Sequence, residues 1–160
     1  MTTPKITPTT NGRTITSTLA QTPTTMSVPG SPPPLTGATA TFPSPGIMLI
    51  TLTRPRQMNS IPYKLHWQLH ALLTWFDGNP ALNVAVITGE GPKAFCAGQD
   101  LIELGKRNSA STSAALEEPW AGKHPDTGFG GISRRVGKKP IIAAVNGYAL
   151  GGGFEIVLNW

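Results

Sequence analysis

The sequence predicts an α/β fold in which buried parallel strands alternate with helices. Two short apolar runs, 84–88 and 141–145, have the length of strands and are bounded by glycine, proline and asparagine. Between the apolar run 47–52 and residue 84, apolar side chains recur at helical spacing. A strand, a helix and a second strand in this order form a unit with parallel strands, so we expect helices packed on a sheet.

The run 47–52 is the first strand that we expect to be ordered. Asn59 or Ser60 is a suitable cap for the following helix, and Pro62 is tolerated in its first turn. The residues predicted to form the buried face of this helix are Ile61, Leu65, Leu69, Leu72, Leu73 and Phe76. The sequence Gly-Asn-Pro at 78–80 ends the helix.

Weaker patterns predict the elements of the second half. Residues 100–106 are typical of a short helix. Residues 108–131 are rich in serine, glycine and proline and lack periodicity, so we expect a mobile loop. A second short helix is expected near 132–138, before the strand at 141–145.

Residues 1–45 differ in composition from the rest of the chain. The first 44 residues contain 14 Thr, 8 Pro and 4 Ser, with no acidic residue and one aromatic residue. Such a segment buries too little apolar surface to offset the entropy lost on ordering, so we expect a disordered tail, with the folded part at 46–160. The tail has the acid-free, hydroxyl-rich composition of an organellar transit peptide, but it carries only two basic residues. A targeting leader and a plain disordered leader are both compatible with it.

The charge distribution, the apolar runs and the single cysteine bear on nucleic-acid binding, membrane spanning and disulfide formation, in that order. The net charge of +5 is spread along the chain, so it does not by itself indicate a nucleic-acid partner. No apolar run approaches the length that spans a membrane. Cys96 has no partner for an internal disulfide and fits a reducing compartment or an organelle matrix. We interpret Cys96 as a packed side chain rather than a nucleophile.

Two histidines, His66 and His70, lie four residues apart on the predicted first helix. This spacing can hold a metal ion, but no third ligand is evident in the sequence. We therefore expect surface or partly buried histidines and no metal site.

The segment 139–155 carries the most chemical information. Its strand runs into three consecutive glycines, Gly151 to Gly153, which let a ligand approach the main chain closely. The N–H groups at the start of the next helix point at such a ligand and favour negative charge. Glu155 lies about one turn beyond Gly152, so an oxyanion donor and a candidate base are brought together.

These glycines do not match the common nucleotide-binding motifs. Ile156 stands where a dinucleotide fingerprint needs its third glycine, and the chain has no Gly-Lys-Ser/Thr sequence of a P-loop. A Gly-x-Ser-x-Gly nucleophile elbow is also absent from the sequence. Taken alone, the glycines are also compatible with a tight packing turn followed by an exposed glutamate.

Three blocks, in order, resemble the crotonase (enoyl-CoA hydratase/isomerase) superfamily. They read RPRQMN at 54–59, AFCAGQDL at 94–101 and NGYALGGGFE at 146–155. The resemblance covers roughly 46–160 and implies a spiral of strand–strand–helix units, of which this chain holds the N-terminal part. It also implies an acyl-CoA substrate and no cofactor.

The resemblance assigns chemical roles to several residues. The main-chain N–H groups of Gln99 and Gly152 are implied to form an oxyanion hole for the enolate of a coenzyme A thioester. Glu155 matches a glutamate that orients and deprotonates the water added to C3 of a 2-enoyl-CoA. Further substrate contacts are expected from Arg56, Ser60, Ala97, Gly98, Asp100, Leu101 and Gly151.

An enoyl-CoA hydratase is therefore the function that we expect, with two alternatives. The family's second catalytic glutamate comes later in the chain than Trp160, so an enoyl-CoA isomerase or another crotonase reaction is also compatible with these residues. A non-catalytic, truncated acyl-CoA-binding fragment is the other alternative. The resemblance implies a homotrimer or hexamer for a full-length form, located in the mitochondrial or peroxisomal matrix, with the cytoplasm as an alternative.

Overall fold

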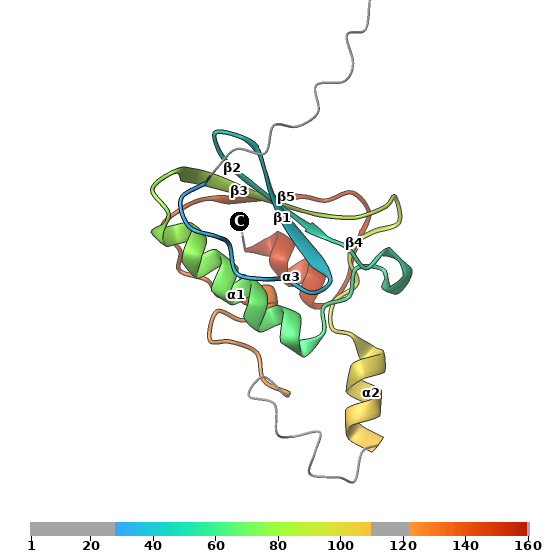
Figure 1. Ribbon diagram of the computed structural model, residues 1–160. Helices are drawn as coiled ribbons and strands as arrows, with labels where there is room; N and C mark the ends of the chain where they lie inside the picture. Colours follow the sequence, from blue (N-terminus) through green and yellow to red (C-terminus); the bar gives the residue numbers. More distant parts are fainter. Residues whose placement is uncertain (1–27, 110–121, 160) are drawn as a thin grey trace, which may run out of the picture.

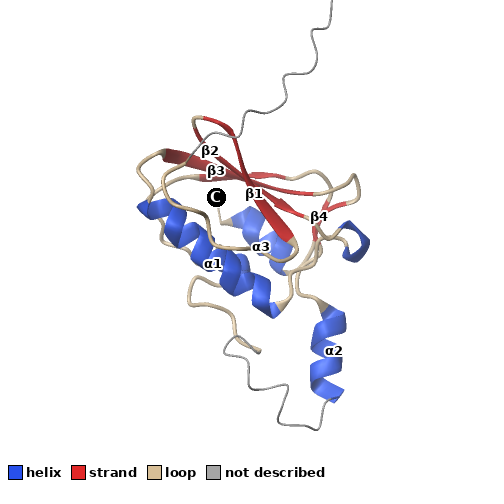
Figure 2. Ribbon diagram, viewed as in Figure 1, coloured by secondary structure: helices blue, strands red, loops and turns tan. Residues whose placement is uncertain are grey.

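The computed structural model describes residues 28–109 and 122–159 and shows an α/β fold (Figures 1 and 2). A four-stranded sheet has the order β1-β2-β3-β5, and a smaller sheet pairs β4 with β6. The elements in chain order are β1 Ala38–Ser44, β2 Gly46–Leu52, η1 Pro55–Gln57, α1 Tyr63–Gly78, β3 Leu82–Gly89, β4 Ala94–Cys96, α2 Leu101–Ser109, η3 Phe129–Gly131, β5 Ile141–Ala144, β6 Tyr148–Ala149 and α3 Gly152–Leu158.

The predicted strand–helix–strand unit is confirmed. Strands β2 and β3 run parallel, and β5 joins β3 on its other side, also in parallel. Helix α1 lies under the sheet, with α3 beside it (Figure 1). All six residues predicted to form the apolar face of the first helix are buried, and they share one core with alternate side chains of β2 and β3. The buried face of α1 therefore packs on one face of the parallel strands.

The ordered part of the chain begins before the predicted boundary at residue 46. Residues 38–44 form strand β1, which pairs antiparallel with β2, and Ala38 is buried in the core. The prediction of disorder was wrong for this segment because the abundance of threonine and proline obscured a Thr–Ala alternation that suits an edge strand. The rest of the predicted tail, 1–27, lies outside the described residues.

The expected helix cap at Asn59 or Ser60 was also wrong. Helix α1 begins at Tyr63, after Pro62 in an extended conformation, and the N–H of Tyr63 donates to the Glu103 carboxylate at 2.8 Å. Asn59 instead has a positive φ of 56°, and its side-chain amide donates to the carbonyls of Glu90 and Ala94. This asparagine therefore ties the turn before α1 to the segment between β3 and β4.

The predicted helix at 132–138 does not form. Turns follow η3, whose residue Gly130 has a φ of 63°, and the Ser133 hydroxyl accepts the main-chain N–H of Phe129. These glycine-dependent turns replace a helical start. Within the predicted mobile loop 108–131, helix α2 extends to Ser109 and residues 122–131 have defined positions, while 110–121 lie outside the described residues.

Candidate active site

The main-chain N–H groups of Gln99 and Gly152 have no acceptor among the described residues. Ile61 forms a parallel bridge beside Gln99, in which its N–H donates to Gly98 O at 2.8 Å and its carbonyl accepts Asp100 N–H at 3.1 Å. The bridge thus occupies the Gly98 carbonyl and the Asp100 N–H, which lie on either side of Gln99 in the chain. The Gln99 N–H therefore points away from Ile61. Gly152 opens helix α3, where the first N–H groups have no partner inside the helix.

Close glycine contacts bring these two groups together. A Cβ at Gly98, where φ is +92°, would lie 3.3 Å from Gly152 N and 2.9 Å from Leu150 O. A Cβ at Gly153 would lie 2.1 Å from the carbonyl oxygen of Cys96. The start of α3 can therefore rest on the 96–98 segment only because both positions are glycine.

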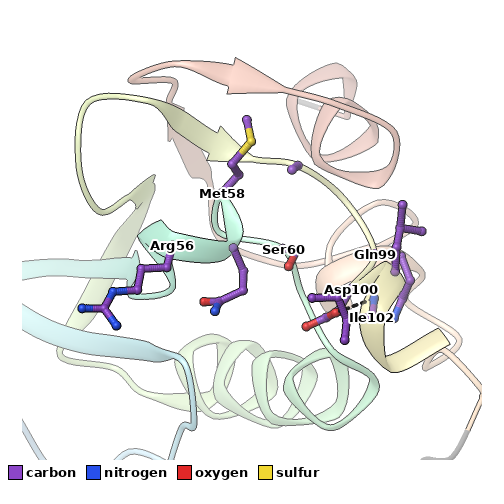
Figure 3. Close-up of a pocket in the computed structure, with 9 residues that line it drawn as sticks. Arg56, Met58, Ser60, Gln99, Asp100 and Ile102 are labelled. Carbon is purple, nitrogen blue, oxygen red and sulfur yellow. Dashed lines mark hydrogen bonds between the residues drawn. The ribbon is translucent and has the colours of Figure 1, made fainter. Parts of the chain in front are cut away.

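A cavity of about 350 Å³ adjoins the Gln99 main chain. Figure 3 shows Arg56 at one end of it and Gln99, Asp100 and Ile102 at the other. The predicted substrate-binding residues that line it are Arg56, Ser60, Ala97, Asp100 and Leu101. The predicted residues Gly98 and Gly151 lie outside this lining, beside the free N–H groups. Two segments that are distant in sequence, 56–60 and 97–101, thus meet at one surface.

Asp100 makes contacts that hold the fold together. Its Oδ1 accepts the N–H groups of Ile102 and Glu103 at the start of α2, and its Oδ2 pairs with Arg54 Nη2 at 2.6 Å. Burial by itself would raise the pKa of Asp100, but the hydrogen bonds from Arg54 and from the Glu103 N–H outweigh it, and the pKa is lowered. The carboxylate is thereby fixed as a helix cap and an ion-pair partner, which positions the Gln99 main chain next to it.

Glu155 stands in the first turn of α3 with its side chain exposed. Its main-chain N–H donates to Gly151 O at 3.1 Å, which fixes the residue one turn beyond the free Gly152 N–H. The Glu155 carboxylate also acts on the pKa of His124, so the two side chains are within electrostatic range. The structure thus places Glu155 in the same first turn of α3 as the Gly152 N–H.

Cys96 is fully buried, and burial raises the pKa of its thiol to about 11. A buried neutral thiol is a poor nucleophile, as expected for a packed side chain. Within residues 28–109 and 122–159, no group of three or more His, Cys, Asp or Glu side chains is placed to hold a metal ion. No helix in the same residues has the length and apolar character needed to cross a membrane.

Comparisons with known proteins show the family to which the chain belongs. The family model described as enoyl-CoA hydratase/isomerase matches residues 43–159. The chain belongs to the enoyl-CoA hydratase/isomerase family. A mevalonyl-coenzyme A hydratase of Beauveria bassiana is 48% identical over 131 residues, covering 79% of this chain and 45% of that protein. A second one, from Aspergillus fumigatus, is 46% identical over 127 residues, covering 79% and 44%.

The fold is that of the same family. The structure of a carnitinyl-CoA dehydratase from Mycobacterium avium is similar with a TM-score of 0.63 and 36% identity, covering 81% of this chain and 45% of that one. The chain spans slightly less than half the length of the curated relatives it matches. The crotonase-like architecture expected from the three sequence blocks is therefore confirmed for this part of the family fold.

The side chains of His66, Gln99 and His124 form a polar cluster in this enoyl-CoA hydratase/isomerase family member. This cluster was not predicted from the sequence. His66 Nε2 lies 2.9 Å from Gln99 Oε1, and His124 Nε2 lies 3.2 Å from the same oxygen. The expectation of a surface or partly buried His66 was wrong, because its side chain is fully buried, whereas His70 is partly buried as expected. No local pattern in the sequence indicated the cluster, because His66, Gln99 and His124 come from distant segments.

We expect the buried His66 to make folding stability fall at acidic pH. The pKa of His66 is lowered from 6.5 to about 4, mainly by burial; the hydrogen bond to Gln99 opposes this shift, and nearby His124 contributes to it. Between these two pH values the unfolded chain binds a proton that the folded chain does not. Stability should therefore drop by on the order of 3 kcal/mol as the pH falls from 6.5 to 4.

Urea unfolding at several pH values measures this effect. The variant His66→Gln keeps a hydrogen-bonding amide but cannot titrate, so its stability should change less over the same pH range. Equal pH dependence in the two proteins would contradict the assignment to His66.

Proposed function

We propose that the protein is an acyl-CoA hydratase that adds water across the C2–C3 double bond of a 2-enoyl-CoA, or removes it in the reverse direction. The observation that carries this proposal is the pair of free N–H groups of Gln99 and Gly152, with Glu155 one turn beyond. Two mevalonyl-CoA hydratases and a carnitinyl-CoA dehydratase among the similar proteins favour hydration over isomerisation.

The two N–H groups are proposed to form an oxyanion hole. The thioester carbonyl oxygen would accept both hydrogen bonds and gather negative charge as the enolate forms. Loss of one such donor typically costs about 10²–10³ in rate. The position of Gly152 at the start of α3 adds the favourable end of a helix dipole to this charge.

Glu155 is proposed to act as the general base. Its carboxylate takes a proton from water while the water oxygen bonds to C3, and the π electrons of the C2–C3 bond move toward the thioester oxygen. Return of the enolate electrons to C2, with uptake of one proton there, completes the addition of water. The reaction as written balances with water alone, so the proposal includes no cofactor.

The cavity next to Gln99 is proposed to hold the coenzyme A portion. Arg56 is exposed at one end of it and is placed to meet phosphate groups, with Ser60 nearby. Residues 97–101 would then contact the adenine end. We further propose, by family resemblance, that these residues form part of a longer crotonase-like domain that assembles as a homotrimer or hexamer.

The decisive assay follows the loss of the conjugated 2-enoyl thioester of crotonyl-CoA by ultraviolet absorbance, with the protein expressed from its complete coding sequence. We expect 3-hydroxybutyryl-CoA as the product. A 3-enoyl-CoA should remain unchanged under the same conditions. Conversion of the 3-enoyl-CoA with no hydration of crotonyl-CoA would replace the proposal with an isomerase.

A further inference from the structure

His66 is fully buried on α1 and makes two hydrogen bonds that define its tautomer. Its Nδ1 accepts the main-chain N–H of Gly130 at 2.8 Å, so this nitrogen carries no proton. The proton of the neutral ring is therefore on Nε2, which donates to Gln99 Oε1 at 2.9 Å. One ring thus joins Gln99, which carries the first free N–H group, to the backbone of η3.

The 3₁₀ helix η3 in turn lies against Gly152, which carries the second free N–H group. A Cβ at Gly152 would lie 2.3 Å from the ring of Phe129, so this ring packs directly on the start of α3. A Cβ at Gly130 would lie 3.0 Å from Ile156 Cδ1, one turn further along the same helix. The Phe129 ring also meets the imidazole of His66 edge to face, with the ring centroids 4.5 Å apart. The first turn of α3 is therefore packed on η3.

The contacts of η3 with α1 are equally close. A Cβ at Gly131, where φ is +69°, would lie 2.6 Å from His70 N, so the two backbones are in direct contact. The Ser133 hydroxyl accepts the Phe129 N–H at 2.8 Å and closes the turn. The buried bond from Gly130 to His66 adds a directional contact to this packing, because a hydrogen bond constrains both distance and angle.

We propose that His66 is a positioning residue that sets the spacing of the two oxyanion donors, Gln99 and Gly152. It acts through the Gln99 side chain on one side and through the backbone of η3 on the other. A ring that is bonded at both ends holds the donors in place before the substrate binds, so they need no reorganisation as negative charge develops. This inference rests on the proposed oxyanion hole and adds a residue from outside the three sequence blocks.

Steady-state kinetics of crotonyl-CoA hydration test this role in variants of the protein expressed from its complete coding sequence. His66→Phe fills the site with a ring that makes neither hydrogen bond, so kcat should fall by about 10²-fold while KM changes by less than about threefold. His66→Gln offers one amide oxygen and one N–H group in place of the two ring nitrogens, so at least about tenfold of this loss should be recovered. The matched control is His70→Phe, one turn along α1, which loses only a bond to Thr127 and should keep kcat within about a factor of two.

A double-mutant cycle separates positioning from a general loss of stability. Gln99→Met removes the acceptor of the His66 Nε2–H bond and keeps the main-chain N–H at position 99. It should lower kcat by a factor similar to that of His66→Phe, and the double variant should lower kcat little further, because both changes break one contact. Losses that multiply in the double variant would overturn the inference, as would a wild-type kcat in His66→Phe. If His66→Phe does not fold, a wild-type kcat in Gln99→Met overturns it.

A titration with acetoacetyl-CoA separates the inference from the proposed function. The enolate of this thioester absorbs ultraviolet light more strongly than its keto form, so binding in an oxyanion hole raises the absorbance. We expect this signal in the wild-type protein and in His66→Gln, and an enolate signal weaker by about tenfold or more in His66→Phe. Absence of crotonyl-CoA hydration would overturn the hydratase, and the titration would still decide the inference. An equal signal in wild type and His66→Phe, or no signal in either protein, would overturn the inference.

Discussion

Replacement of Glu155 by glutamine should lower kcat for crotonyl-CoA hydration by about 10²–10⁴-fold and change KM little. Glutamine has nearly the same shape as glutamate, so the first turn of α3 and its bond to Gly151 are retained. What is lost is the ability to take a proton from water. Steady-state kinetics with crotonyl-CoA measure both constants.

The matched control for this substitution is Glu90→Gln. Glu90 is an exposed carboxylate just after β3, and the main-chain oxygen that bonds to Asn59 is unaffected by the change. We expect kcat within a factor of about two of wild type for this variant. A wild-type kcat for Glu155→Gln would remove Glu155 from the mechanism, while a large loss in Glu90→Gln would point to a general charge effect.

Replacement of Gly153 by alanine should lower kcat/KM by about 10²-fold or more. The added Cβ would lie 2.1 Å from the Cys96 carbonyl oxygen, which belongs to a rigid backbone segment and cannot rotate away. Helix α3 must then shift, and the Gly152 N–H moves relative to that of Gln99. A misplacement of about 1 Å in such a site is enough for a loss of this size.

Gly105→Ala provides the comparison. Gly105 lies inside α2, and a Cβ there meets no atom within 4 Å. Alanine in a helix interior is favoured over glycine by roughly 0.5–1 kcal/mol, so this variant should be as stable as wild type or more so. Thermal unfolding and kcat/KM are measured for both variants. A Gly153→Ala protein with wild-type values of both would contradict the close packing of α3 on the 96–98 segment.

Much of the architecture was predictable because local patterns determine it. The spacing of Leu65, Leu69 and Phe76 requires a helix with one buried face, and the apolar runs before Gly89 and Asn146 predict strands. The expectation that the second run is a buried strand was wrong, because only Ile141 of β5 is buried while Ile142 and Val145 are exposed. The helix that carries Glu155 was likewise predictable, because glycines such as Gly151, with its φ of 51°, allow the tight turn from which a helix can start. The errors at 38–44 and 132–138 occurred where composition was dominated by threonine or interrupted by glycine.

The sequence by itself determined the strands β2, β3 and β5, the helices α1 to α3 and the family, because short-range periodicity and three contiguous blocks carry that information. Only the tertiary structure decided which groups are left free. The Gln99 N–H lacks an acceptor because Ile61, far away in sequence, pairs with the residues on both sides of it. The orientation of the Gln99 amide depends on His66, and that of His66 depends on the Gly130 N–H. Which donor groups are free and how these side chains are oriented depend on contacts between distant segments, and no local pattern of residues specifies such contacts.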